Sequence, residues 1–187
     1  MSGRALAAAA LAILALLATA GCRTAKEPPV APPNPLADSA DQVMFGVRTF
    51  ITDQGLLRAQ LRADTGYFFD GNSRIEVRNE RTVFFTNTGQ QSAVLTSQEG
   101  TYSTTRSMME ARKNVVVIST DGKRLESSQL SFNQVTNLIS SDSAFVLTEP
   151  ERRVEGVGFT SDPSLSNFKI LKLNKGAGPI PLSGQKP

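Results

Sequence analysis

The stretch Leu61-Arg62-Ala63-Asp64-Thr65-Gly66-Tyr67 decides the fold, because its pattern returns twice further along the chain. In each copy a leucine stands two residues before a small side chain, and an aromatic follows four or five residues later. The other copies are Leu95-x-Ser97…Tyr102 and Leu125-x-Ser127…Phe132, so the leucines are 34 and 30 residues apart. A β-unit of this size cannot bury its apolar face alone, and neighbouring units must stack into one elongated core.

Strand and turn signals fill the region between the repeats. The segment 74–78 alternates charged and apolar residues, and the pairs Asp70-Gly71 and Asp121-Gly122 suit tight hairpin turns. The best helical candidate, Leu56 to Leu61, is too short to form a helix. The run Val115 to Ile118 is apolar on both faces, which predicts a strand covered on both sides.

These signals predict an all-β fold of about ten to fifteen antiparallel strands. Without helices to cover a face, two sheets must pack on each other, or one sheet must roll over on itself. We therefore expect a twisted β-jelly roll, or folded antiparallel sheet of repeated hairpins, over residues 42–173, followed by a disordered Gly/Pro-rich tail at 174–187.

Composition excludes several classes of function. The 187 residues include no histidine and one cysteine, which removes a Ser-His-Asp triad, His ligation of metals and internal disulfides. The serine pairs 127–128 and 140–141 lack an evident general base. A net charge of +3 without a basic run does not indicate nucleic-acid binding. We expect no enzyme, no catalytic residue, no cofactor and no metal.

The amino terminus resembles a targeting signal followed by a membrane anchor. Residues 1–21 resemble a lipoprotein signal peptide, and Thr19-Ala20-Gly21-Cys22 resembles a lipobox whose cysteine is lipidated. Cleaved soluble secretion and a retained transmembrane helix are the alternatives. Residues 22–41 contain five prolines after Cys22, which predicts an extended linker without packed structure.

The order of motifs resembles the LptC family, the periplasmic component of the lipopolysaccharide export (Lpt) ABC transporter system. The resemblance covers residues 45–170 and is carried by Leu61-Arg62-Ala63-Asp64, Asn114 to Val117, Leu125-Glu126-Ser127 and the closing segment Val154 to Asp162. It implies a β-jelly roll, shared with LptA-like bridge proteins, whose interior receives the acyl chains of lipopolysaccharide. The lipid would arrive from the inner-membrane Lpt ABC transporter subunits and pass to an LptA-like periplasmic bridge protein.

The resemblance also implies a location in the periplasm of a Gram-negative bacterium. LptC proteins often carry an amino-terminal transmembrane helix, so a lipid anchor at Cys22 is a departure from the family. The inner membrane is favoured by the family, and the outer membrane is left open. A membrane-anchored β-rich lipoprotein with a structural or protein- or glycan-binding role is the alternative function.

We expect the inward residues of the repeated strands to line a hydrophobic groove for lipid. Those residues are Leu61, Tyr67, Ile75, Val77, Val83, Phe85, Tyr102, Val115, Val117, Leu125, Phe132, Val146 and Phe159. The inward parity is left open in the runs 83–85 and 115–118, because a slip of one residue moves every side chain to the other face. The same residues could instead pack on one another as a closed core. Phe168 and Ile170 are the expected partner edge, on a last strand from Asn167 to Leu173.

Overall fold

The computed structural model describes residues 34–177, which form one antiparallel sheet preceded by a short helix. The elements are the helix α2 (Pro35–Ser39) and the strands β1 (Gln42–Asp53), β2 (Leu56–Phe69), β3 (Arg74–Phe85), β4 (Gln91–Ser103), β5 (Met108–Ser119), β6 (Arg124–Asn133), β7 (Leu138–Glu149), β8 (Arg152–Ser161) and β9 (Lys169–Ala177). The predicted all-β class is confirmed. The expected ten to fifteen strands are too many, because strands β1 to β8 are 10 to 14 residues long.

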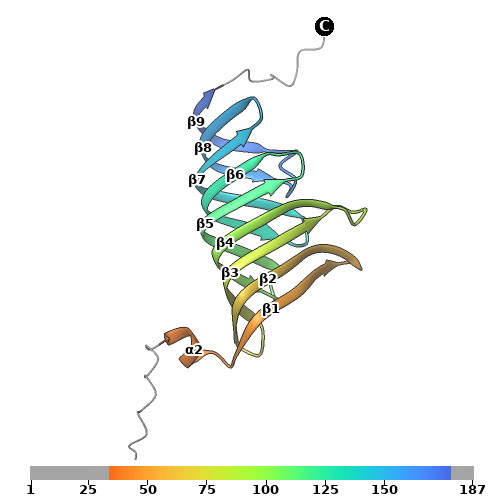
Figure 1. Cartoon of the computed structure of the whole chain (residues 1–187), viewed down its shortest axis with the longest axis vertical. Helices are drawn as coiled ribbons and strands as arrows, with labels where there is room; N and C mark the ends of the chain where they lie inside the picture. The colour runs from red at the N-terminus through yellow and green to blue at the C-terminus, as the bar shows by residue number, and fades with distance from the viewer. Residues whose placement is uncertain (1–33, 178–187) are drawn as a thin grey trace, which may run out of the picture. The chain divides into compact units, whose positions relative to one another are not determined.

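Each strand pairs only with its neighbours in the chain, so the strand order is β1 through β9 without a crossover (Figure 1). Residues with a positive φ angle form the connecting turns. Gln54 and Gly55, with φ of 49° and 79°, join β1 to β2, while Asp70, Gly71 and Asn72 join β2 to β3. The hairpin turns predicted at Asp70-Gly71 and Asp121-Gly122 are confirmed, and the hairpins succeed one another along the sheet.

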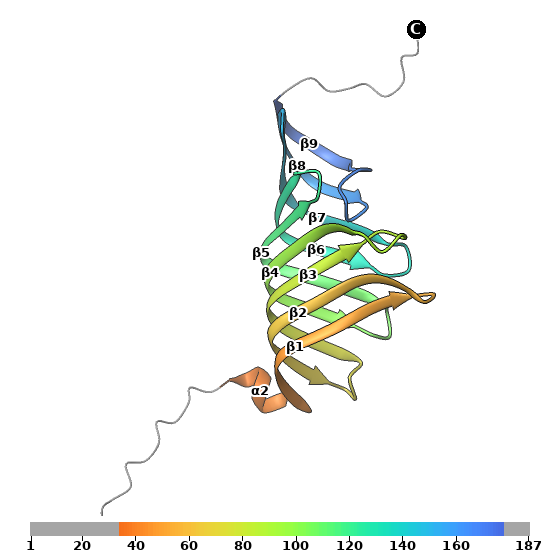
Figure 2. The same ribbon diagram turned by 45° about the vertical axis from the view of Figure 1, so that its right-hand side comes forward.

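The strands bend near their middles, and the sheet folds over its own inner face (Figure 2). Asn79 in β3 and Lys113 and Asn114 in β5 have positive φ at these bends. The pairing register of β4 with β5 shifts between Thr96 and Glu99. Such irregularities bend a strand and re-aim the side chains beyond them. One long strand therefore contributes to both layers of the folded sheet.

The repeated leucines form one row through the core. Leu61 lies opposite Thr82, which lies opposite Leu95, and the row continues through Val117 to Leu125. These five side chains are all buried. The repeat therefore places equivalent residues two strands apart on the same face of the sheet, which is the stacking that its spacing predicts.

The sheet begins at Gln42, as the predicted domain does, but ordered structure extends past both ends of that domain. Residues 35–39, expected in an unstructured linker, form helix α2, which Asn34 caps through hydrogen bonds from the N–H groups of Leu36 and Ala37. Asn34 also donates a hydrogen bond to the Tyr67 hydroxyl (3.0 Å), which attaches the helix to β2. At the other end, β9 continues to Ala177, past the expected end at residue 173. Leu56 to Leu61 opens β2 and is not helical.

Candidate functional site

An apolar cavity of about 440 Å³ lies inside the fold at its β1 end. Its wall combines side chains from the first four strands, and both layers of the folded sheet contribute. The lining side chains are Met44, Val47, Arg48, Thr49, Ile51, Leu61, Phe68, Ile75, Val77 and Tyr102, with Gly46 adding backbone. A volume of this size falls within the ~300–1,000 Å³ of small-molecule sites. The wall is mainly hydrocarbon, so the cavity suits an apolar chain.

Strand pairing explains why these residues meet. Phe68 lies opposite Ile75, and Ile75 lies opposite Tyr102, so one row of cross-strand partners forms one wall. Val77 lies two residues from Ile75 and points to the same side, as the period of a strand requires. Beyond the bend, Leu61 belongs to the other layer and faces this row across the interior.

A hydrogen-bonded bridge closes the margin of the cavity. The Tyr102 hydroxyl donates to Oε1 of Gln134 (3.0 Å), in the turn between β6 and β7. Nε2 of Gln134 in turn donates to the main-chain oxygen of Thr52, near the end of β1. Burial raises the pKa of Tyr102, so its phenol keeps the hydrogen that this bridge uses. One glutamine thus joins segments 82 positions apart and holds the two layers together.

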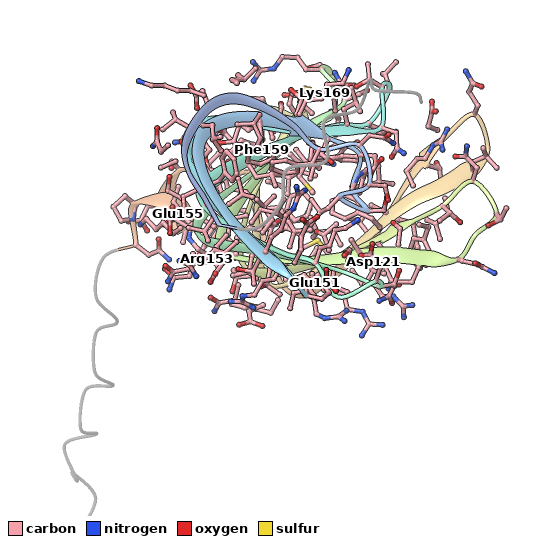
Figure 3. All side chains as sticks on the ribbon, turned by 90° about the horizontal axis from the view of Figure 1, so that it is seen from above. Asp121, Glu151, Arg153, Glu155, Phe159 and Lys169 are labelled. Carbon is pink, nitrogen blue, oxygen red and sulfur yellow. The ribbon has the colours of Figure 1, made fainter. Side chains whose placement is uncertain are left out.

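Beyond the cavity the interior is filled by the protein's own side chains. Phe84 of β3 packs against Phe132 of β6 with ring centroids 4.9 Å apart. At the β9 end, Phe159 stacks on Phe168 (5.0 Å) and meets Phe145 edge-on (5.4 Å). Figure 3, which looks along the stack of strands, places Phe159 within the curve of the sheet. An unfilled furrow along the whole stack is therefore absent from the described residues, and the open volume is at the β1 end.

One carboxylic acid lies in this apolar interior. Glu80 is 2% exposed, and Oε1 of its carboxyl lies 2.8 Å from Oγ of Ser97. Its second oxygen, Oε2, is buried without a hydrogen-bond partner. Burial raises the pKa of Glu80 from 4.5 to about 7, against the smaller opposing effect of the Ser97 hydrogen bond. The sequence did not single out this residue.

Most of the predicted groove residues face the interior. Ile75, Val77, Tyr102 and Leu61 line the cavity, whereas five others lie deeper and are packed in the core. The buried members of the second set are Val115, Val117, Leu125, Phe132 and Phe159. Four predicted groove residues do not face the interior.

Three of the expected groove residues lie on the outer face of their strands, and two of them belong to the run 83–85, whose parity the sequence left open. Phe84 is fully buried, so the half-buried Val83 and Phe85 beside it lie on the opposite face of β3. In β7 Phe145 and Leu147 are both buried, which places Val146 between them on the outer face. The bends shift the alternation of each strand, and a pattern read without them gives the wrong face.

Two further predicted placements are wrong. Tyr67 is buried beneath Asn34 on the outer face, and its neighbour Phe68 lines the cavity. The run Val115 to Ile118 is covered on one side only, because Ile118 is 46% exposed.

The two edges of the sheet carry exposed apolar side chains. On β1, Phe45 is 80% and Phe50 is 55% exposed; on β9, Leu171 is 72% and Ile170 is 37% exposed. Within residues 34–177 each of these strands pairs on one side only. Phe168, predicted as part of the edge, instead precedes β9 and packs in the aromatic cluster.

A second hollow of about 840 Å³ lies elsewhere, over β4 to β9. Lys113, Glu126 and Glu155 are among the residues at this wide, shallow depression. Figure 3 places Glu155 outside the curve of the sheet. Charged groups at an open surface stay hydrated, so this hollow is a poorer site for hydrocarbon than the smaller interior cavity.

Comparison with protein families decides the identity of the fold. A family model described as "Lipopolysaccharide-assembly, LptC-related" matches residues 7–177, most of the chain. The chain belongs to the LptC family. A search of curated proteins finds no match. The predicted resemblance is confirmed, and LptC membership assigns the chain a role in lipopolysaccharide export with other Lpt proteins.

As an LptC-family chain, the protein is a transport component of the periplasmic, inner-membrane-associated part of that system. No helix within residues 34–177 has the length and apolar character to cross a membrane. The predicted signal peptide, Cys22 and most of the linker lie outside the described residues, as does the tail from residue 178.

Proposed function

We propose that this LptC chain receives acyl chains of lipopolysaccharide in the cavity at the β1 end and passes them toward the β9 end. The apolar cavity of about 440 Å³ carries the proposal, because it is an open, hydrocarbon-lined volume within an otherwise filled interior. Its place at the first strands suits an acceptor position. The lipid would come from the Lpt ABC transporter subunits in the inner membrane, and an LptA-like bridge protein would take it onward.

Binding energetics favour partial burial of the lipid. Full burial of a twelve-carbon chain would stabilise it by about 10 kcal/mol, at ~0.8 kcal/mol per methylene. Several chains held so strongly would not leave. A cavity that takes part of each chain, followed by sites of similar affinity, keeps transfer nearly isoenergetic. The transporter then supplies direction.

Onward movement requires the two layers to separate. The Phe84–Phe132 contact joins the layers beyond the cavity, and the Gln134 bridge joins them at its margin. A net hydrogen bond contributes only about 1 kcal/mol, so the bridge is weak enough to open and reform. We propose that a lipid advances as these contacts give way in turn.

The sheet edges would connect the protein to its neighbours. An unpaired strand edge is a template for strand addition from another chain. Ile170 and Leu171 give β9 the apolar side chains that such a contact would cover. We propose that β9 pairs with the LptA-like bridge protein and β1 with the transporter, while lipidated Cys22 holds the chain at the membrane.

Photocrosslinking from neighbouring residues tests the cavity. A photoreactive amino acid at Ile75, which lines the cavity, is expected to crosslink lipopolysaccharide in cells. The same amino acid at Glu76, the next residue on the strand, points to the opposite face and serves as the matched control. Equal crosslinking from both positions, or none from position 75 in a folded protein, would exclude the cavity as the lipid site.

A further inference from the structure

Glu80 is the feature of the interior that a plain hydrocarbon channel does not require. Among the described residues, Glu80 is the only buried residue with an ionisable carboxyl group. The other buried polar residues are serines and one threonine. A buried carboxyl costs free energy unless its atoms are hydrogen-bonded. In Glu80 one of the two carboxyl oxygens, Oε2, has no hydrogen-bond partner.

The hydrogen bonds of Ser97 determine which atom of Glu80 carries hydrogen. Oγ of Ser97 lies 2.8 Å from Oε1 of Glu80 and also 2.8 Å from the main-chain oxygen of Glu99. A serine hydroxyl has one hydrogen, and a carbonyl oxygen can only accept. Both contacts are satisfied when Ser97 donates to Glu99 and a protonated Oε1 donates to Ser97. Oε2 is then the carbonyl oxygen of a neutral acid, an acceptor without a donor.

A glycine provides the space for this oxygen. A Cβ atom at position 100 would overlap Oε2 of Glu80 and would lie 2.7 Å from Cγ2 of Val77. Val77 also lines the apolar cavity. Glu80 itself does not line the cavity, but its free oxygen and Val77 are neighbours above Gly100, so a chain lying along Val77 is separated from an unused acceptor by one side chain of the cavity wall.

We propose that Oε2 of Glu80 accepts a hydrogen bond from a donor on the bound acyl chain, so that the cavity prefers chains that carry a hydroxyl group. This inference rests on the proposed lipid cavity and adds selectivity to it. The Glu80 carboxyl is a specificity-determining group within an apolar site. A hydroxyl group buried there without an acceptor would lose its hydrogen bonds to water, whereas Oε2 replaces one of them.

Competition binding to the purified full chain tests the proposal. The ligands are tetradecanoic acid and two derivatives with a single hydroxyl, near the carboxyl end or near the methyl end, each displacing a fluorescent fatty acid at about pH 6. The wild type is expected to bind at least one hydroxylated chain about fivefold more tightly than the plain chain, the effect of one net hydrogen bond. The affinity ratio within each protein cancels differences in folding and in ligand solubility.

Two variants separate recognition from structure. Glu80→Gln retains the preference, because its amide N–H can donate to Ser97 while its carbonyl oxygen accepts from the ligand. Glu80→Met loses the preference but keeps the affinity for tetradecanoic acid. A preference that survives in Glu80→Met, or a wild type that does not discriminate, would overturn the inference and leave the cavity standing. If neither kind of chain binds, the proposed lipid site fails as well.

Discussion

Replacing Glu80 by glutamine should change how the stability of the protein depends on pH. The wild-type carboxyl is 2% exposed and unpaired at one oxygen, so the folded protein favours its neutral form. Glutamine has nearly the same shape, can still hydrogen-bond to Ser97 and never ionises. The free energies of unfolding of the two proteins should therefore change in parallel at acidic pH and diverge as the pH rises.

The magnitude follows from the raised pKa of Glu80. The unfolded chain releases this proton near pH 4.5, but the folded protein retains it to about pH 7. Between these values each pH unit lowers the free energy of unfolding by about 1.4 kcal/mol, because the folded state binds the extra proton. Stability from this group is thus highest below pH 4.5, and about 3 kcal/mol has been lost once pH exceeds 7.

Urea unfolding followed by far-ultraviolet circular dichroism measures the effect, since the chain has no tryptophan. The free-energy difference between Glu80→Gln and wild type should grow by about 3 kcal/mol in favour of the variant from pH 4.5 to pH 8. Other carboxyls do not obscure this window. Asp121 and Asp162 have lowered pKa values, so their contribution is lost only as pH falls into the acid range. A difference that stays constant from pH 5 to pH 8 would refute the reasoning.

Two further substitutions test the β9 edge and the anchor. Gly156→Ala should cost about 1–3 kcal/mol of stability, because the new Cβ would lie 2.6 Å from the main-chain oxygen of Lys172 on β9; urea unfolding measures the cost, and capture of an LptA-like partner should fall with it. An unchanged unfolding midpoint would show that β9 does not approach this closely. Cys22→Ala should abolish incorporation of labelled palmitate and release the protein from membranes. Membrane retention without label would instead favour an uncleaved apolar segment.

The overall fold was predictable because the repeat fixes one row of the core. Leu61, Leu95 and Leu125 lie two strands apart in space, as a stack of hairpins requires. The family could also be predicted, since the order of loosely matching motifs is retained along the chain. Both inferences depend on long-range regularity, which small local irregularities do not disturb.

Which residues of each strand point inward was less predictable, because the strand bends do not appear as a change in amino-acid composition. In β3, Ile75 and Val77 face inward, so simple alternation would place Asn79 inside. Asn79 instead has a φ of 51°, and the next inward residue is Glu80. The same kind of shift explains why Phe84 was missed in favour of Val83. A charged residue beside a strand bend can therefore be buried against the expectation from its chemical type.

Phe68 could have been found from the sequence. Tyr102 and Phe132 each follow their repeat leucine by seven residues, and residue 68 follows Leu61 by the same interval. The preceding aromatic, Tyr67, satisfied the looser spacing and was chosen instead. The exact interval is the better guide, because equal spacing along paired strands places side chains in the same row.

Pairing restricted to chain neighbours has a consequence for how this protein is made. Every hairpin can form as soon as its own two strands have left the translocation machinery, without waiting for a distant segment. The sheet can then grow by one strand at a time from β1, and each step has only a modest entropic cost of loop closure. β1 therefore offers a free edge early in biogenesis, and β9 completes the opposite edge last.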